Sequence, residues 1–220
     1  MNLLSRVGDS TLGRELDKLG TVNWQNRKAN VKKKIRDMAE KLIRVAAQRE
    51  VISIEKMFVP ENYNEFSKKF PFELTEDQEN TINQILSDLE TGRLIDRLIC
   101  GDVGFGKTEV AIRTAFVVAS AGYQVALVAP TTILVKQHYN SFLHRFKNSS
   151  MRVASLSRMT NNADRRSIKK DLISGDINII IGTHALLSND VDFSNLGLLI
   201  IDEEQHFGVA QKEKIKELQG

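Results

Sequence analysis

A glycine-rich segment and a later acidic pair are the parts of this sequence best suited to chemistry. The segment has the phosphate-binding pattern G-x-x-x-x-G-K-[ST] and consists of Gly101, Asp102, Val103, Gly104, Phe105, Gly106, Lys107 and Thr108. Gly104 and Gly106 allow backbone N–H groups to approach phosphate oxygens without interference from a Cβ atom. Lys107 suits the β- and γ-phosphates, and the Thr108 hydroxyl suits a magnesium ion. We therefore expect this segment to bind ATP with Mg²⁺, rather than to be a chance glycine-rich turn.

The acidic pair, Asp202 and Glu203, follows four apolar residues that are typical of a buried strand, Leu198–Ile201. Such a strand would deliver both carboxylates to its C-terminal end, facing the phosphate-binding segment. Asp202 is then expected to hold Mg²⁺, directly or through water. Glu203 is expected to orient or deprotonate the attacking water, so Lys107 and Glu203 are the predicted catalytic residues. An isolated Asp-Glu pair is more often a solvated turn, and Glu204 is assigned no role.

Short apolar segments alternate with segments of helical periodicity through most of the chain. The predicted strands are residues 97–100, 124–129, 153–156, 178–181 and 198–201, and the predicted helices are residues 75–90, 107–121, 133–147 and 162–173. Continuous apolar strands separated by helices indicate an α/β protein, here a RecA-like parallel sheet with helices on both faces. This lobe is predicted for residues 59–220. Because such sheets normally continue past the acidic strand, we expect the lobe to be truncated.

Positive charge is concentrated near the N-terminus, although the net charge of the chain is only +3. Between Trp24 and Arg49 nine Lys or Arg residues stand against two acids, which gives +7 and leaves −4 for all other residues. Apolar residues recur here at helical spacing, namely Val31, Ile35, Met38, Leu42 and Val45. The pattern predicts a long basic amphipathic linker helix within residues 21–58. Lysine-rich faces are usually solvated surface, so direct DNA contact by this helix is the less favoured interpretation.

The composition favours a cytoplasmic protein without a membrane segment. No apolar run approaches the ~20 residues that a membrane-spanning helix requires. The N-terminus lacks the basic region and long apolar stretch of a secretory signal. The single cysteine, Cys100, cannot form an internal disulfide. Its place at the end of a predicted strand indicates a small buried residue rather than a reactive thiol.

Further short motifs are in register with the ATP motifs and resemble those of superfamily 2 nucleic-acid motors. Asp202 to Gln205 is similar to motif II of the D-E-x-Q/H type. The remaining motifs supply the predicted DNA contacts, Pro130, Thr131 and Thr132 after one strand and Gly182, Thr183 and His184 after another. These loops would offer N–H and hydroxyl groups to phosphates without reading base sequence. Taken alone, Pro-Thr-Thr is more often just a helix cap.

An upstream stretch from Phe72 to Gln78 resembles a Q-motif. The Gln78 side chain can both donate to and accept from the edge of adenine. We expect Phe72 and Gln78 to take part in nucleotide binding. For Phe72 simple core packing is an equally good interpretation.

Longer strings are similar to the bacterial transcription-repair coupling factor family. The resemblance is carried by Asp96–Ala111, by Pro130–Leu134 with Gln137 and His138, by Gly182–Leu187 and by Leu198–Val209. It extends upstream to Leu16–Gly20, to Trp24 with Gln25, and to the basic segment that follows. The fork-remodelling helicase RecG shares the motor motifs but not the upstream stretch, which makes it the second choice.

The resemblance implies a motor that moves along double-stranded DNA with ATP, dislodges stalled RNA polymerase and recruits excision-repair proteins. Residues 1–20 would then be the remnant of a polymerase-interaction domain, and the basic helix would join that domain to the motor. The second motor lobe with its arginine fingers has no counterpart in this sequence. We therefore expect a lobe that is inactive or very weak alone. The alternative is a non-catalytic module that binds nucleotide, DNA or a partner.

Overall fold

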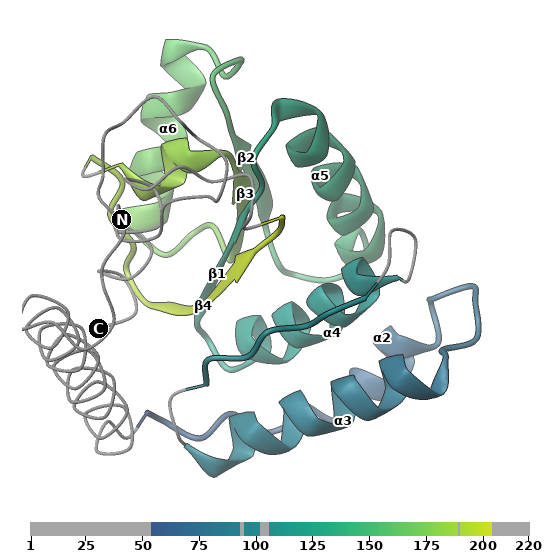
Figure 1. Cartoon of the computed structure of the whole chain (residues 1–220). Helices are drawn as coiled ribbons and strands as arrows, with labels where there is room; N and C mark the ends of the chain where they lie inside the picture. The colour runs from purple at the N-terminus through teal and green to yellow at the C-terminus, as the bar shows by residue number, and fades with distance from the viewer. Residues whose placement is uncertain (1–53, 93–94, 102–105, 189, 204–220) are drawn as a thin grey trace, which may run out of the picture. The chain divides into compact units, whose positions relative to one another are not determined.

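The computed structural model describes residues 54–92, 95–101, 106–188 and 190–203 (Figure 1). Predictions for residues 1–53, which include the polymerase-domain remnant and most of the basic helix, lie outside the described residues. So do residues 102–105 of the phosphate-binding segment. Within the described residues, no helix is long and apolar enough to cross a membrane.

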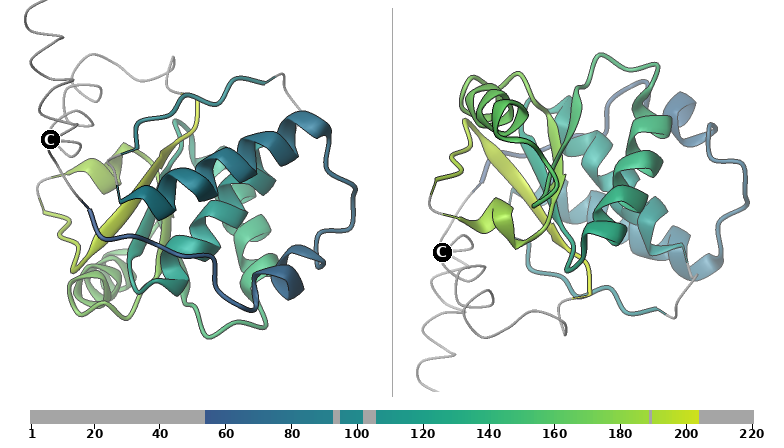
Figure 2. Two further views of the ribbon diagram at one scale, coloured as in Figure 1. Left: turned by 90° about the horizontal axis from the view of Figure 1, so that it is seen from below. Right: turned by 90° about the horizontal axis from the view of Figure 1, so that it is seen from above.

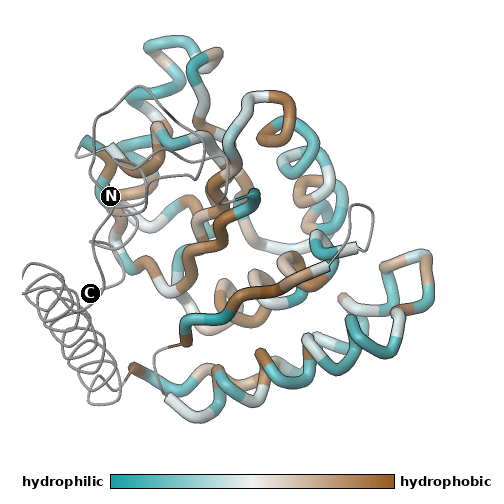
Figure 3. Tube along the Cα trace, in the orientation of Figure 1, coloured by the Kyte–Doolittle hydropathy of each residue, from teal (hydrophilic) through white to brown (hydrophobic). Residues whose placement is uncertain are grey.

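Four parallel strands form the sheet. In the spatial order β2-β3-β1-β4, they are β2 (Val153–Leu156), β3 (Ile179–Gly182), β1 (Gln124–Val128) and β4 (Leu196–Ile201). The register pairs Val125 with Ile179 on one side of β1 and with Leu198 on the other. Every residue of β1 and β3 is buried. Such continuous apolar strands fit a sheet that is covered on both faces, and Figure 3 shows hydrophobic residues along them.

Successive residues of the central strands point to opposite faces, and two separate cores result. One core takes Val125 and Leu127 of β1 and packs them against α4 (Lys107–Ser120) and α5 (Thr132–Phe146). The other takes Ala126 and Val128 and packs them against α6 (Asn162–Ile173) and the short 3-10 helix η1 (His184–Leu187). Figures 1 and 2 show these two groups of helices on opposite sides of the sheet. The predicted RecA-like sheet with helices on both faces is therefore confirmed.

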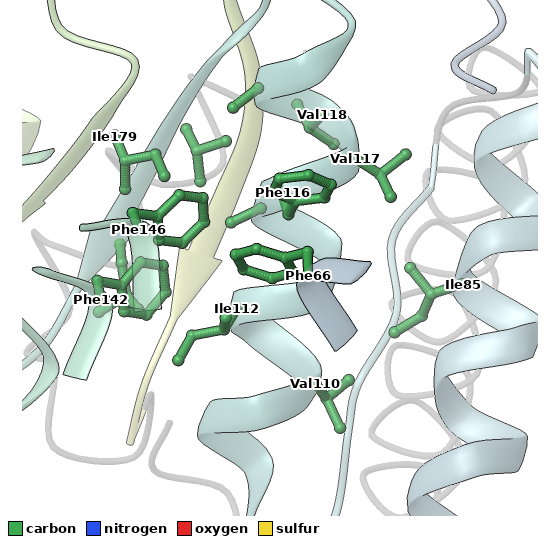
Figure 4. Packing of buried hydrophobic residues seen from close by; sticks show 14 of the residues in the cluster. Phe66, Ile85, Val110, Ile112, Phe116, Val117, Val118, Phe142, Phe146 and Ile179 are labelled. Carbon is green, nitrogen blue, oxygen red and sulfur yellow. The ribbon is translucent and has the colours of Figure 1, made fainter. Parts of the chain in front are cut away.

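Aromatic rings join the connector before α3 to the larger core (Figure 4). Phe66 on α2 (Tyr63–Ser67) stacks on Phe116 of α4, with ring centroids 3.9 Å apart. Phe66 also lies against Phe146 at 5.1 Å, and all three rings are buried. Buried aromatic side chains contribute large areas to a core, so this cluster fixes α2 against the helix that begins at the phosphate-binding segment.

Helix α3 (Glu76–Thr91) has the ends that the sequence predicts. The Thr75 hydroxyl accepts a hydrogen bond from the backbone N–H of Gln78 at 3.3 Å. The Gln78 side chain accepts one in return from the backbone N–H of Thr75 at 2.9 Å. This reciprocal capping box satisfies two N–H groups that a helix start otherwise leaves without partners. Gly92 ends the helix at φ 69°, a left-handed conformation that favours glycine.

Residues 97–100 do not form the predicted strand, since residues 95–101 have no regular secondary structure. The Arg97 guanidinium forms an ion pair with Asp88 and donates to the Gln84 side chain at 2.8 Å, both on α3. These contacts hold the segment beside a helix, and Leu98 is 81% exposed. The prediction that Cys100 is buried was also wrong. Cys100 is exposed, because the strand that would have buried it does not form.

Residues 54–58 form no helix, although we placed them at the end of the basic linker helix. The backbone N–H groups of Ile54 and Met57 donate to the carbonyls of Gly92 and Leu89 at 2.9 and 3.1 Å. Met57 is buried. These bonds satisfy carbonyl groups at the end of α3, so the segment is tied to that helix and cannot continue another.

Candidate nucleotide-binding site

The loops that follow the four strands lie at one edge of the sheet, because the strands are parallel. Ligands of open α/β sheets bind outside the carboxyl ends of the strands. Residues 129–132 follow β1, residues 157–160 follow β2, residues 183–184 follow β3 and residues 202–203 follow β4. This edge therefore gathers the predicted magnesium ligand Asp202 and both predicted DNA-contacting loops.

The described end of the phosphate-binding segment is the start of α4. Gly106 is the residue before the helix and has φ 71°, which L side chains rarely adopt. Lys107 and Thr108 open the first turn and are half-buried. The Lys107 ammonium donates to the carbonyl of Gly101 across the segment. The N–H groups and dipole of a helix start favour an anion, so this turn is suited to a phosphate group.

Asp202 is held at the end of β4 by bonds to two other elements. Its backbone N–H donates to the carbonyl of Val128 at 2.9 Å, at the end of β1. Its Oδ2 lies 2.7 Å from Nε2 of His138 on α5. The hydrogen bond to His138 is the main cause that lowers the Asp202 pKa, although burial acts in the opposite direction. The carboxylate is therefore ionised at neutral pH, and Nε2–H of His138 donates to it.

The charge of Lys107 also contributes to the lowered pKa of Asp202. An opposite charge favours the ionised carboxylate only over a short range. Lys107 is thus close enough to influence the Asp202 carboxylate, although the two residues are 95 positions apart in the sequence. An ammonium and a carboxylate so placed suit the predicted binding of a triphosphate with its metal ion.

Glu203 directly follows Asp202 and has φ 54°, a left-handed conformation in a residue other than glycine. Among the described residues it is the one non-glycine with positive φ. Such a conformation costs roughly 1–3 kcal/mol and tends to occur at functional sites. This conformation occurs directly after the predicted metal ligand Asp202, at the residue predicted to orient water.

The oxygen donors present fit a magnesium ion. Mg²⁺ in nucleotide sites is bound through one or two protein oxygens together with substrate phosphates. Thr108 offers a hydroxyl in the first turn of α4, and Asp202 offers an ionised carboxylate. A carboxylate has about four acceptor positions, so the bond to His138 does not prevent Asp202 from binding a metal.

The two predicted adenine contacts lie in different surroundings. Phe72 is 72% exposed, which rules out the core-packing interpretation. It lies edge-on against Phe70 at 5.5 Å, and both rings line a surface cavity of about 530 Å³ together with Glu79 and Arg113. Gln78 is buried, and a Cβ atom on Gly106 would lie 2.3 Å from its Nε2. Of the two, Gln78 lies against Gly106, within the described part of the phosphate-binding segment.

The first predicted DNA-contacting loop leads from β1 into α5. Thr131 is exposed, and its hydroxyl accepts the N–H of Leu134 at 3.2 Å as the cap of the helix. Pro130 and Thr132 on either side of it are half-buried. The alternative that Pro-Thr-Thr is a helix cap therefore holds, and it leaves the Thr131 side chain at the surface of the loop.

The second predicted loop is more deeply packed. Gly182 is buried, and a Cβ atom there would lie 2.4 Å from the carbonyl oxygen of Leu156, so the close approach of β2 requires glycine. Thr183 is also buried and caps η1 through a 3.4 Å bond from Ala185 N–H. His184 is half-buried, with Nε2 3.4 Å from a guanidinium nitrogen of Arg158. Of this loop, His184 and its neighbour Arg158 are the groups that reach the surface.

His138 is the site residue for which the sequence analysis assigned no role. It appeared only as part of the resemblance, in the string that contains Gln137. Its contact with Asp202 joins positions 64 residues apart. Periodicity places His138 on a helix but does not indicate its partner, so only the fold reveals it.

The comparisons with known proteins agree with this geometry. The chain belongs to the DEAD/DEAH box helicase family, whose model matches residues 75–220.

Within that family the similar curated proteins are transcription-repair-coupling factors. The protein from Rickettsia bellii (strain RML369-C) is 52% identical over 209 residues, which cover 93% of this chain and 19% of the relative. The protein from Bacillus subtilis (strain 168) is 46% identical over 214 residues, or 96% of this chain and 18% of the relative. The chain thus spans about a fifth of the length of the relatives that it matches, and the resemblance found in the sequence is confirmed.

Solved structures place the fold among helicases. The structure of RecG bound to a three-way DNA junction superposes with a TM-score of 0.69 at 37% identity, covering 75% of this chain and 23% of RecG. An ATP-dependent RNA helicase from Sulfolobus tokodaii, described as hypothetical, superposes with a TM-score of 0.56 at 20% identity. The superposed region covers 73% of this chain and 46% of the RNA helicase chain. The chain is therefore a helicase-like motor lobe similar to that of transcription-repair-coupling factors.

Proposed function

We propose that this chain is the ATP-binding motor lobe of a double-stranded DNA translocase that acts in transcription-coupled DNA repair. The observation that supports the proposal is the position of Asp202 at the carboxyl end of β4, fixed by His138 at 2.7 Å and close enough to Lys107 for its charge to lower the Asp202 pKa. The similarity to transcription-repair-coupling factors supports the biological role. The same similarity supports a cytoplasmic location.

In this proposal each residue of the site has a defined task. Residues 101–108 hold the phosphates, with Lys107 at the β- and γ-phosphates. Thr108 and Asp202 hold Mg²⁺, which neutralises charge on the phosphates when it is bound. Glu203 orients or deprotonates the attacking water. Gln78, which contacts Gly106, binds the adenine edge, and Phe72 contacts the base from the neighbouring cavity.

The DNA contacts of the proposal are the loops 130–132 and 182–184. Their position on one edge with the nucleotide site suits a motor in which ATP binding and DNA binding influence each other. Phosphate contacts of this kind position a duplex without reading its sequence. RNA polymerase and excision-repair proteins are the further partners that the family implies.

The isolated chain is expected to bind ATP but to hydrolyse it slowly. Arginine fingers from a second element increase the rate about 10³–10⁵-fold in other phosphate-loop enzymes. The family resemblance implies that a second motor lobe supplies these fingers. A separately added second lobe is therefore expected to raise the rate of hydrolysis.

The test is isothermal titration calorimetry of ATP in the presence of Mg²⁺, with wild-type chain and with Lys107→Ala. A hydrogen bond to a charged group contributes about 1.5–3 kcal/mol, so the variant is expected to bind ATP about tenfold more weakly or worse. The same preparations are assayed for hydrolysis with and without duplex DNA. Hydrolysis at the rate of a complete motor, abolished by Lys107→Ala, would contradict dependence on a second lobe.

A second candidate function is a non-catalytic module that binds DNA or a partner through the basic segment. It is favoured by the charge of +7 between Trp24 and Arg49. Phosphate contacts make DNA affinity fall steeply as the salt concentration rises. The slope of a salt titration therefore reports how many phosphates the Lys and Arg side chains neutralise. Combined Lys32→Glu, Lys33→Glu and Lys34→Glu changes should then reduce the slope. An unchanged slope and affinity would remove this segment from DNA binding.

A fork-remodelling activity like that of RecG is the alternative within the same class. The structural likeness to RecG favours it, whereas the upstream resemblance favours the coupling factor. Binding of the chain to linear duplex and to a three-way junction of equal length distinguishes the two. A strong preference for the junction would favour the RecG-like alternative.

A further inference from the structure

The residue that fixes the Asp202 carboxylate comes from the helix that begins at a predicted DNA-contacting loop. His138 lies on α5, whose cap is Thr131, and its side chain is 13% exposed. Asp202 lies at the end of β4 and its side chain is 25% exposed. Nε2 of His138 and Oδ2 of Asp202 are 2.7 Å apart, which is a short charge-assisted hydrogen bond. The contact joins α5 to the end of β4, between residues 64 positions apart in the sequence.

We propose that His138 is the positioning residue for magnesium, holding the Asp202 carboxylate through its Nε2–H group. The proposal rests on the proposed function, because it assigns to Asp202 the role of metal ligand. The backbone of Asp202 is already held by the carbonyl of Val128. The bond from His138 therefore fixes the remaining freedom, which is rotation of the side chain.

The chemistry of metal ligands explains why such a partner matters. Carboxylates that bind metals are themselves hydrogen-bonded, and loss of the outer partner typically weakens metal affinity or activity about 10–100-fold. A rotating carboxylate would have to be ordered each time Mg²⁺ arrived with the nucleotide. His138 orders it in advance, so the metal meets an oriented oxygen.

The position of His138 on α5 connects the predicted DNA-contacting loop at Thr131 with the predicted metal ligand Asp202. It lies six positions after Thr132, the first residue of the helix, which corresponds to about 9 Å along the axis. The Thr131 cap and the Asp202 contact thus sit on one rigid helix. A displacement of the loop on DNA binding would move His138 and, through it, the metal-binding carboxylate.

The test measures how Mg²⁺ affects nucleotide affinity, independently of hydrolysis. The purified chain is titrated with a fluorescent ATP analogue in EDTA, and then with MgCl₂ at fixed nucleotide to find the half-saturating Mg²⁺ concentration. His138→Ala is expected to raise that concentration about 10–100-fold and to leave affinity in EDTA unchanged. His138→Gln, which retains an N–H donor, should restore much of the loss.

Two controls separate positioning from a general effect on the fold. His144→Ala removes an exposed histidine from the same helix and should leave the half-saturating concentration unchanged. Urea unfolding of each variant shows whether it is folded. If His138→Ala does not fold, His138→Asn serves, because its shorter side chain keeps a polar group but does not reach Asp202.

The outcomes distinguish this inference from the proposed function. A His138→Ala chain with the wild-type half-saturating concentration would overturn the role of His138 and leave the site intact. The same half-saturation in His138→Gln and His138→Ala, both raised, would show that the hydrogen bond is not the cause. A wild-type chain that binds no nucleotide in EDTA or in Mg²⁺ would contradict the proposed function itself.

Discussion

The side-chain amide of Gln78 lies directly against the backbone of Gly106. A Cβ atom added to Gly106 would be 2.3 Å from Nε2 of Gln78. Gln78 is at the same time part of the capping box of α3, and Gly106 precedes the helix that carries Lys107. The start of one helix is thus packed against the start of another, and the phosphate-binding segment is fixed at its C-terminal end.

Gly106→Ala is therefore expected to damage the site as well as the fold. Its positive φ alone should cost about 1–2 kcal/mol in the free energy of unfolding, and Gln78 must also move away. Gly122→Ala is the matched control, because Gly122 has φ 89° with nothing within 4 Å of an added Cβ. Urea unfolding and ATP titration should show that both variants lose stability and only Gly106→Ala loses ATP affinity. Equal ATP affinity in the two variants would contradict the close packing.

Gln78→Ala tests whether Gln78 binds adenine as well as capping α3. Thr75→Ala is its partner in the comparison, since it removes the other half of the capping box and should cost about 1 kcal/mol. Both variants are expected to be less stable. Only Gln78→Ala should lose preference for ATP over GTP in competition binding. If Thr75→Ala loses the preference to the same degree, the effect comes from the helix end and not from a contact with the base.

The buried ion pair between Glu109 and Arg145 joins α4 to α5. Arg145 donates to Glu109 at 2.9 Å and to the carbonyl of Phe66 at 3.2 Å, and both charged side chains are buried. Desolvation lowers the Arg145 pKa, and the charge of Glu109 opposes that shift. Removing one partner of a buried pair costs about 3–5 kcal/mol when the remaining charge has no other partner. Glu109 would keep Arg113, whose Nε lies 2.7 Å from its Oε1.

Arg145→Met is therefore expected to lower the free energy of unfolding by about 3 kcal/mol, the lower end of that range. Arg152→Met serves as control, because Arg152 pairs with Asp171 while its side chain is 53% exposed. Exposed pairs contribute about 0–1 kcal/mol. Chemical denaturation of both variants measures the difference. A loss in Arg145→Met no larger than that in Arg152→Met would mean that the buried pair contributes little.

The Asp190 carboxyl should titrate at unusually low pH. The hydrogen bond from Lys169 on α6 is the main cause that lowers its pKa to about 2, and the Ser188 hydroxyl adds to it. Because the folded pKa is depressed, the stabilisation is present above the ordinary value of 3.8 and is lost as the pH falls toward 2. NMR titration of the carboxyl carbon should show this midpoint in wild-type chain and a higher one in Lys169→Met. Lys170→Met, at the exposed neighbouring lysine, is the control and should leave the Asp190 midpoint unchanged. A wild-type midpoint near 3.8 would refute the pairing of Asp190 with Lys169.

The sequence predicted most of the sheet because its central strands, β1 and β3, are buried on both faces. Residues 179–181 are three consecutive isoleucines, and such runs are hard to place anywhere but in a covered strand. Helix caps such as Thr75 are local signals and were equally clear. The position of Asp202 facing the phosphate-binding segment was predicted from the four apolar residues that precede it.

The errors and omissions come from contacts that a linear pattern does not encode. Residues 97–100 have the apolar content of a strand, yet Arg97 is tied to side chains nine and thirteen positions earlier on α3. Phe72 is a large apolar residue of the kind found in cores, but it is exposed and lines a surface cavity. His138 is a polar residue on a helix, and only the fold places it beside Asp202. The contact of His138 in particular joins positions 64 residues apart, which no local pattern reveals.

In the proposed function, Lys107 and Asp202 form one site for ATP and magnesium. Calorimetric titration of ATP into wild-type, Lys107→Ala and Asp202→Asn chains, each with Mg²⁺ and with EDTA, tests it most directly. We predict that Mg²⁺ strengthens ATP binding by wild-type chain and that Asp202→Asn keeps the affinity seen in EDTA while losing this enhancement. Lys107→Ala should weaken binding in both conditions. Full magnesium enhancement in Asp202→Asn, or unchanged ATP affinity in Lys107→Ala, would contradict the claim.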